Sequence, residues 1–324
     1  MRCRRRHLDD LKLTAVGKVG SRLAIAAVLG LCAVYTLQAQ DSAPQPAAAR
    51  PAQAVQLRPL MTAQGIGGRE YFMHRQEIVP VGASVLRLPI LMYHYVRTPP
   101  STRTDLLGYR LSVSPDDFRL QMDWLYANHY HPVTFDQVRA YFAGQIPLPP
   151  RPVVITLDDG YADLYTAAFP VLQAHGFTAV AYIVSGFVDT GRYVTHDQVL
   201  QMDRAGIEIA SHTVDHADMA RASTGMATYE LVQSKRWLET LLGHPVVDFA
   251  YPSGRYNAST IQLLDQLGYD TAVVEDGPSM HSRANRYTWG RVRVGGGESL
   301  TEFIANLGVP MPSVTLSSLH ISSS

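Results

Sequence analysis

Two adjacent carboxylates follow a strongly apolar stretch in VVITLDDGYADLY, residues 153–165. The apolar run ends at Leu157, and Asp158, Asp159 and Gly160 come directly after it. Two neighbouring negative charges at the end of a buried strand are costly unless a cation or a proton-transfer role compensates for them. The pattern therefore predicts either metal binding or acid–base chemistry at this point of the chain.

A second apolar stretch ends in histidines, in IEIASHTVDHADM, residues 207–219. His212 and His216 are four residues apart, a spacing that brings two imidazoles together on one helical turn or in a tight loop. With a carboxylate from a neighbouring strand end, they form a two-histidine, one-carboxylate set that holds a divalent cation and leaves positions open. Either motif alone is common in turns and on helix surfaces, but their shared position after strands favours a metal site.

The two aspartates then need different roles. One metal ligand accounts for only one of them, so we assign Asp159 to the metal and Asp158 to a free carboxylate that takes a proton from metal-bound water. Thr213 follows His212, which excludes the HExxH protease motif. An iron-dependent oxygenase uses a similar ligand set, but on a jelly roll, and this chain is not all-β.

Apolar strands and helical patterns alternate from residue 88 onward. This alternation predicts parallel βα units, and about seven such units favour a barrel over an open sheet. In parallel barrels the chemistry lies at the carboxyl ends of the strands, where Gly160 would let both aspartates turn into the same mouth. The predicted strands are 89–96, 153–157, 178–184, 207–211, 246–251, 271–274 and 291–294, and the predicted helices are 115–128, 162–175, 228–242, 258–267 and 299–307.

The chain ends have a different composition. Residues 1–39 are predicted to be a signal peptide or membrane anchor, because seven Lys and Arg against two Asp up to Arg22 are followed by an uncharged apolar run from Leu23. We expect export to the periplasm or cell envelope, with attachment to the inner membrane if the segment is not cleaved. Residues 40–87 are predicted to be a linker and N-terminal extension, 88–308 the single catalytic domain, and 309–324 a flexible tail.

The composition of the remainder excludes some classes of function. Cys3 and Cys32 are the only cysteines, so the chain beyond the leader can hold neither a disulfide nor a thiolate metal site. That remainder is mildly acidic, which gives no sign of nucleic-acid binding.

Three motifs in this order resemble a known family. TLDDG, SHTVDH and FAYPSGRYN are similar to the first three motifs of the polysaccharide deacetylases, carbohydrate esterase family 4, which share a NodB-like domain. PILMYHYV and GRVRV resemble the poly-N-acetylglucosamine deacetylase branch. The resemblance covers roughly residues 88–308. It implies an α/β fold, a distorted (β/α)7-type barrel, and a metal-dependent hydrolase that removes N-acetyl groups from N-acetylglucosamine-containing polysaccharide of the cell envelope.

The same resemblance implies roles for single residues. Asp158 would be the general base, and Asp159, His212 and His216 would hold the metal, with Zn²⁺ as the default and Co²⁺, Ni²⁺ or Fe²⁺ as alternatives. The oxyanion would be stabilised by the metal and by the backbone N–H of Ser253. Its neighbours in the third motif, Tyr251 and Pro252, are grouped with it as substrate-contacting residues, although Tyr251 could equally pack in the core.

The chain departs from the family pattern at several points. Ser253 stands where an aromatic residue usually precedes the glycine of the third motif, and His196 stands where a tryptophan is common. Ala250 stands where many members have an arginine that orients the base, and either Arg291 or Arg255 could replace it. The late Leu-x-His motif that supplies an acid in other branches is not evident. We therefore expect His94, in MYHYV, to contact acetate or donate a proton.

Two other classes of function compete with deacetylation. One is a non-catalytic glycan-binding or assembly protein that retains the deacetylase barrel, suggested by Ala250, Ser253 and the missing late histidine. The retained Asp158 argues against it, because a binder needs no base. The other is a barrel glycosidase with two carboxylates about 5 to 9 Å apart. Adjacent aspartates could hardly bracket a glycosidic bond, and such an enzyme has no use for His212 and His216.

Overall fold

A computed structural model of the chain describes residues 83–308. The predicted leader, most of the linker and the predicted tail lie outside the described residues. Within residues 83–308, no helix has both the length and the apolar character needed to cross a membrane.

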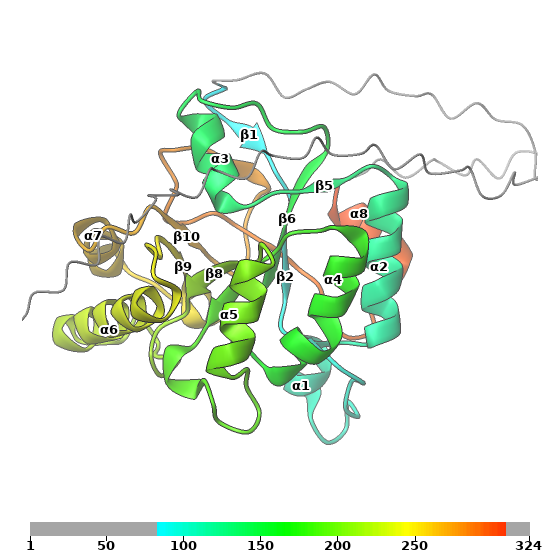
Figure 1. Ribbon diagram of the computed structural model, residues 1–324, viewed down its shortest axis with the longest axis horizontal. Coiled ribbons are helices and arrows are strands. Elements are labelled where there is room, and N and C mark those ends of the chain that lie inside the picture. The colour runs from blue at the N-terminus through cyan, green and yellow to red at the C-terminus, as the bar shows by residue number, and fades with distance from the viewer. Residues whose placement is uncertain (1–82, 309–324) are drawn as a thin grey trace, which may run out of the picture. The chain divides into compact units, whose positions relative to one another are not determined.

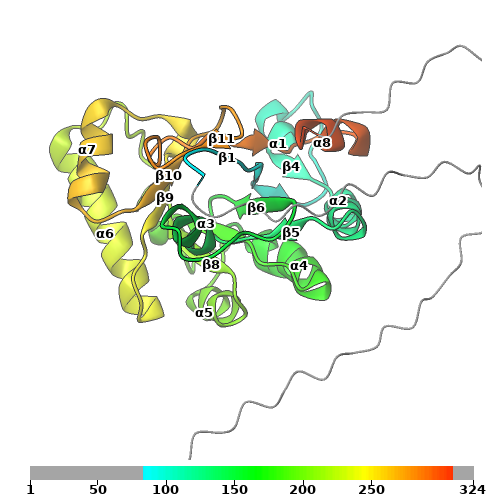
Figure 2. The same cartoon turned by 90° about the horizontal axis from the view of Figure 1, so that it is seen from above.

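Eight strands form one parallel sheet that curls upon itself (Figures 1 and 2). The order of hydrogen-bonded neighbours is β10-β9-β8-β7-β6-β2-β12, and β5 joins the start of β6. This arrangement confirms the predicted parallel α/β barrel. The strands are β2 (Ile90–Tyr93), β5 (His131–Pro132), β6 (Pro152–Leu157), β7 (Val180–Ile183), β8 (Glu208–Ser211), β9 (Asp248–Ala250), β10 (Thr271–Val273) and β12 (Val292–Arg293).

Two strand pairs lie outside this sheet. β3 (Tyr95–Val96) pairs with β4 (Ser112–Val113), and β1 (Leu86–Arg87) pairs antiparallel with β11 (Met280–His281). Since β1 falls within the range predicted to be linker and extension, the ordered fold begins before residue 88.

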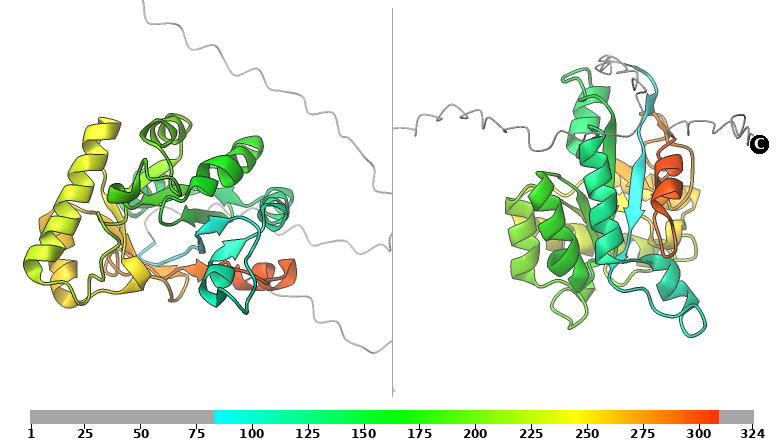
Figure 3. Two further views of the ribbon diagram at one scale, coloured as in Figure 1. Left: turned by 90° about the horizontal axis from the view of Figure 1, so that it is seen from below. Right: turned by 90° about the vertical axis from the view of Figure 1, so that its right-hand side faces the viewer.

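Helices cover the outside of the curled sheet (Figure 3). The α-helices of the described residues are α4 (Phe169–His175), preceded by a π-helical turn over Leu164–Ala168, and α1 (Leu106–Leu111), α2 (Pro115–Ala127), α3 (Phe135–Phe142), α5 (His196–Arg204), α6 (Thr224–Leu242), α7 (Ala258–Gln266) and α8 (Leu300–Asn306).

Local sequence explains most helix boundaries. Ser114 caps α2, whose first residue is proline, and Gly243 ends α6 in the left-handed conformation that glycine adopts without strain. α6 begins earlier than predicted because Ser223 caps it at Thr224. Helices α1, α3 and α5 were not predicted from the sequence. The last two have the capping boxes TFDQ and THDQ, a signal that could have located them.

The barrel closes through the segment that precedes β12. Val273 of β10 forms an isolated parallel bridge with Trp289, and Val274 donates its N–H to the Trp289 carbonyl at 2.9 Å. Three residues further on, Val292 of β12 pairs with β2. The chain from residue 289 to 293 therefore joins the two edges of the sheet, and it carries Arg291 between them.

The inside and outside of the barrel have separate cores. Strand residues such as Val154, Val180 and Ala210 face the interior, and α3 covers its amino end with Phe135 and Tyr141. The outer faces of the strands pack against the surrounding helices. Strands buried on both faces explain the continuous apolar runs of the sequence.

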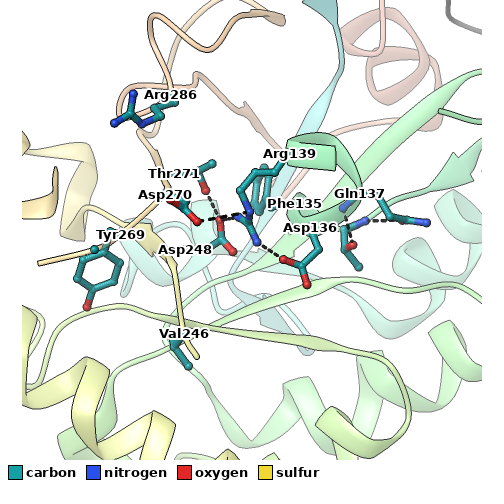
Figure 4. A network of polar contacts seen from close by, with 12 residues as sticks. Phe135, Asp136, Gln137, Arg139, Val246, Asp248, Tyr269, Asp270, Thr271 and Arg286 are labelled. Carbon is teal, nitrogen blue, oxygen red and sulfur yellow. Dashed lines mark hydrogen bonds and ion pairs between the residues drawn. The ribbon is translucent and has the colours of Figure 1, made fainter. Parts of the chain in front are cut away.

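Arg139 of α3 anchors a polar network at the amino end of the barrel (Figure 4). Its guanidinium contacts Asp248 and Asp136, and lies 3.8 Å from Glu208 and 4.0 Å from Asp270. Burial, together with repulsion from Asp248, raises the pKa of Glu208 well above its usual range. The arginine therefore compensates several partly desolvated carboxylates at once.

Replacing Arg139 by methionine is expected to lower the free energy of unfolding by about 2 kcal/mol, because buried carboxylates lose their counter-charge. Urea unfolding measured at neutral pH would test this. Arg119→Met on the exposed face of α2 is the control and should change stability by less than about 0.5 kcal/mol. Equal stability of the two variants would contradict the role of the network.

Candidate metal and catalytic site

The candidate site lies where parallel strands end. Asp158 and Asp159 follow β6 directly, and His212 follows β8. Asp159 has a φ of 71° and Gly160 a φ of 76°. Two successive left-handed residues turn the chain sharply, so that the neighbouring carboxylates no longer point to opposite faces as they would in a strand.

Asp159, His212 and His216 form one cluster whose ligand atoms all lie within 4.8 Å of one another. The Nε2 atoms of His212 and His216 lie 3.3 Å and 3.4 Å from Oδ1 of Asp159. That oxygen is buried and accepts no hydrogen bond from the described residues. A buried, unpaired carboxylate oxygen facing two imidazole nitrogens fits a divalent metal ion.

The tautomer of His212 suits a ligand. Its Nδ1 lies 2.8 Å from the Ala250 carbonyl oxygen, an acceptor that can only be paired if Nδ1 carries the hydrogen. Nε2 then keeps its lone pair and faces Asp159. Histidines that bind metals usually donate their other ring N–H to a carbonyl or carboxylate in this way, which fixes the ring.

The loop that carries the histidines is strained. Thr213 has a φ of 69° and His216 a φ of 56°, both in the left-handed region that side chains with a Cβ seldom adopt. The HxxxH spacing is thus realised in a tight loop and not on a helix, one of the two arrangements left open by the sequence. Such strain concentrates at functional sites, where the surrounding fold imposes it.

Asp158 lies outside the cluster and is held by Arg291. The guanidinium donates two hydrogen bonds of 2.7 Å, from Nη1 to Oδ1 and from Nη2 to Oδ2. Nη1 also donates to Thr156 Oγ1 at 3.0 Å, and Nε donates to the Val274 carbonyl at 3.1 Å. Burial alone would raise the pKa of Asp158, but Arg291 outweighs it and holds the pKa below its usual value. The carboxylate is therefore ionised at neutral pH and fixed in orientation.

The structure decides between the two arginines that the sequence left open. Arg255 is exposed and donates to Asp218 at 2.9 Å, away from the aspartate pair. Arg291 is buried and meets Asp158 in a bidentate arrangement. Arg291 therefore makes the contact to Asp158 that Ala250 cannot make.

His94 follows β2 and lies beside the same carboxylate. Its Nε2 is 3.9 Å from Oδ2 of Asp158, and its buried Nδ1 has no hydrogen-bond partner among the described residues. Burial lowers the pKa of His94, although Asp158 and Asp159 oppose the shift. The imidazole is therefore neutral at neutral pH, with one ring nitrogen free for a substrate atom.

The third motif follows β9, and its residues differ in burial. The ring of Tyr251 is fully buried against Phe249, so packing, and not exposure in the cleft, describes this side chain. Pro252 is buried as well, whereas Ser253 is exposed and has a φ of 54°. Of the two positions that the sequence left open for Tyr251, the structure shows the packed one. The roles of Pro252 and of the Ser253 N–H in substrate contact stay predictions.

A column of aromatic rings next to the candidate metal cluster was not predicted from the sequence. Tyr95 and Tyr161 stack at a centroid distance of 3.6 Å, and Tyr161 and Tyr193 stack at 5.1 Å. Tyr161 comes directly after the DDG motif, which is the signal that could have pointed to it. Backbone hydrogen bonds from Ala162 to Arg192 and from Val194 to Gly160 fix the column to the loop of Asp159. The three rings therefore brace the loop that carries Asp159.

Fold and site together define a class: a parallel (β/α) barrel hydrolase with a two-histidine, one-carboxylate cluster and a separate, arginine-held aspartate. Residues 145–272 match the family model for polysaccharide deacetylase. A putative polysaccharide deacetylase of Bacillus subtilis, YxkH, is 30% identical over 217 residues, which cover 67% of this chain and 75% of the relative. The chain belongs to the polysaccharide deacetylase family, and the prediction of a polysaccharide N-deacetylase is confirmed at this level.

Further relatives support the same assignment. The poly-beta-1,6-N-acetyl-D-glucosamine N-deacetylase of Escherichia coli K12 is 30% identical over 237 residues, covering 60% of this chain but only 35% of that protein. Among solved structures, the Streptococcus pyogenes deacetylase PplD in complex with acetate is similar with a TM-score of 0.63 and 27% identity, over 68% of this chain and 98% of that one. IcaB from Ammonifex degensii shares the fold, with a TM-score of 0.60 and 24% identity over 71% of this chain and 100% of that one.

Proposed function

We propose that this chain is a metal-dependent hydrolase that removes N-acetyl groups from N-acetylglucosamine-containing polysaccharide of the cell envelope. The single observation that carries the proposal is the position of Asp158. It is excluded from the ligand cluster, yet Arg291 fixes it directly beside that cluster as an ionised carboxylate. A protein that only bound glycan or metal would have no use for this buried base, whose burial needs a dedicated counter-charge.

The chemistry follows from the positions of the side chains. A divalent ion held by Asp159, His212 and His216 would act as a Lewis acid and lower the pKa of a bound water towards about 7. Asp158 accepts a proton from the attacking water as general base. Arg291 keeps both carboxylate oxygens oriented during this transfer. His94 lies next to Asp158 with a free ring nitrogen, which suits contact with the acetyl group or delivery of a proton to the leaving amine.

Substrate, metal and location are parts of the same proposal. The Escherichia coli relative, named a poly-beta-1,6-N-acetyl-D-glucosamine N-deacetylase, favours that polymer, with peptidoglycan and chitin-like oligomers as alternatives. Zinc is the metal we expect, because two imidazoles and one carboxylate suit it, while cobalt, nickel and iron bind similar sets. The basic and apolar leader supports export to the periplasm or cell envelope and attachment to the inner membrane if it is retained.

Removing the metal is expected to abolish acetate release. Chelation of the purified protein should stop release from all three glycans, and addition of Zn²⁺ should restore it. His212→Ala should lose both bound metal and activity, because two remaining ligands hold a divalent ion poorly. His244→Ala, which removes an exposed histidine elsewhere, is the control and should keep both. Acetate release is measured enzymatically, and the metal content of the same sample by mass spectrometry.

Two outcomes would favour the competing functions. Tight glycan binding without any acetate release, in a sample that contains its metal, would support the non-catalytic binding protein. New reducing ends without acetate would support a glycosidase. Release that persists in full after chelation would contradict the metal-dependent mechanism.

A further inference from the structure

Two outer helices border a groove whose inner end lies against the loop that carries His212 and His216. α5 and α6 are neighbours on the outside of the sheet (Figure 2), and between them lies a hollow of about 690 Å³. Its inner end is formed by Gly186 and Val214. Val214 stands between the two candidate metal ligands His212 and His216 in the same loop. The groove therefore adjoins the loop of His212 and His216, next to the place where we propose that the acetamide is hydrolysed.

Hydrogen bonds couple this loop to the groove. Val214 and Asp215 donate their N–H groups to Oε2 of Glu230 on α6, at 2.8 Å and 3.0 Å. Gly186 donates its N–H to the Val214 carbonyl at 2.9 Å. A Cβ at Gly186 would come within 2.6 Å of that carbonyl oxygen, so only glycine allows the two loops to approach this closely. The inner end of the groove is thus a fixed part of the site.

One face of α6 lines the length of the groove. Tyr229, Gln233, Arg236 and Trp237 recur at helical spacing, and His196 of α5 lies opposite, with its ring 5.1 Å from that of Trp237. From Tyr229 to Trp237 the helix rises roughly 12 Å, the length of a short oligosaccharide, at 1.5 Å per residue. The groove offers aromatic rings together with amide, guanidinium and indole donors, which suit the apolar faces and the oxygen atoms of sugars.

The charge of the groove distinguishes substrate from product. Asp189 is paired with the ring of His196, and Asp215 lies beside Gly186 at the inner end. The lining along α6 contains no carboxylate, and none of the described carboxylates pairs with the guanidinium of Arg236. N-acetylglucosamine units are neutral, whereas deacetylated glucosamine units carry an ammonium group. An unpaired arginine repels that cation and tolerates the neutral acetamide.

From these observations we propose that the α5–α6 groove binds further sugar units of the polymer whose acetamide lies at the metal site, and that it favours acetylated over deacetylated units. This inference deepens the proposed function and rests on it. The occupant is the glycan itself, because the groove adjoins the loop of His212 and His216 and its donors match sugar oxygens.

The first test uses chain length. The kcat/KM for acetate release is measured for N-acetylglucosamine disaccharide and hexamer, and the hexamer should be the better substrate. Tyr229→Ala should lower kcat/KM for the hexamer about tenfold, as expected for loss of one aromatic anchor, and should reduce the hexamer-to-disaccharide ratio. Tyr126→Ala on α2 is the matched control, since Tyr126 is 55% exposed and Tyr229 50% exposed. A ratio near one, or equal values for both variants, would overturn the proposal.

The second test uses charge. Arg236→Glu should reverse the preference, so that glucosamine hexamer binds more tightly than N-acetylglucosamine hexamer at low salt, and added salt should weaken this effect. Arg236→Gln should leave the two ligands bound about equally. An unchanged preference in Arg236→Glu would overturn the assignment of this residue to the groove.

A binding measurement separates failure of the groove from failure of the proposed function. Trp237 is one of three tryptophans in the chain, so hexamer bound in the groove should change the tryptophan fluorescence of the metal-loaded protein, and Trp237→Phe should remove the change. A fluorescence change without acetate release from any oligomer supports the groove and contradicts the deacetylase. Acetate release without a fluorescence change, and without dependence on Tyr229, overturns the groove alone.

Discussion

Asp158→Asn is expected to lower acetate release by a factor of about 10² to 10⁴ while the protein keeps its metal. Asparagine has nearly the same shape, but it cannot accept the proton of the attacking water. The ligand cluster of Asp159, His212 and His216 does not include Asp158, so metal affinity should not depend on it. Acetate release and metal content are measured on the same preparation of the full chain.

A control substitution tests whether the position of the carboxylate matters, and not the loss of a negative charge alone. Asp215→Asn removes the same charge from an exposed residue of the histidine loop and should leave turnover within about twofold of the original. Normal turnover by Asp158→Asn would show that another group is the base. Loss of metal from Asp158→Asn would instead place Asp158 among the ligands.

Arg291→Met is expected to destabilise the protein by about 3–5 kcal/mol, because it leaves Asp158 buried without a counter-charge. The methionine also lets burial raise the pKa of Asp158, so that the general base is partly protonated and activity falls with it. Urea unfolding and the pH dependence of acetate release are the two measurements. The acid limb of the pH profile should move to higher pH in Arg291→Met.

The control for Arg291 is the other arginine that the sequence proposed. Arg255→Met breaks an exposed pair with Asp218, and should change stability by no more than about 1 kcal/mol with no shift of the pH profile.

Two further variants test the pairing of Arg291 with Asp158. Arg291→Lys keeps the charge but not the bidentate contact, and should retain only part of the activity. The double variant Arg291→Met with Asp158→Asn should be more stable than Arg291→Met alone, because the uncompensated charge is gone. Independent, additive effects would contradict the proposed pairing.

The stacked tyrosines explain why the loop that carries Asp159 can hold residues with strained backbone angles. Asp159 and Gly160 both have positive φ, and Tyr161 immediately after them is stacked between Tyr95 and Tyr193. Contacts on both faces of this ring hold the strained turn in place. The Asp159 carboxylate therefore stays close to His212 and His216. Strain of this kind persists only where several neighbouring contacts hold the backbone in place.

The sequence by itself determined the barrel and the chemical types at its mouth. Continuous apolar runs alternate with capped helical segments, and this pattern reflects strands buried on both faces. Asp158, Asp159 and His212 stand directly after such runs, so the parallel topology alone brings them to one end of the barrel. These features are local in the chain, and therefore readable from it.

Only the tertiary structure decided which partners meet. Arg291 is more than a hundred residues from Asp158 in sequence, and it reaches the base because the chain from residue 289 to 293 closes the barrel between β10 and β2. The burial of the Tyr251 ring and the groove between α5 and α6 likewise depend on helices packed against one another. Long-range contacts of this kind leave no periodic signal in a single sequence, since they are set by the curvature and closure of the sheet.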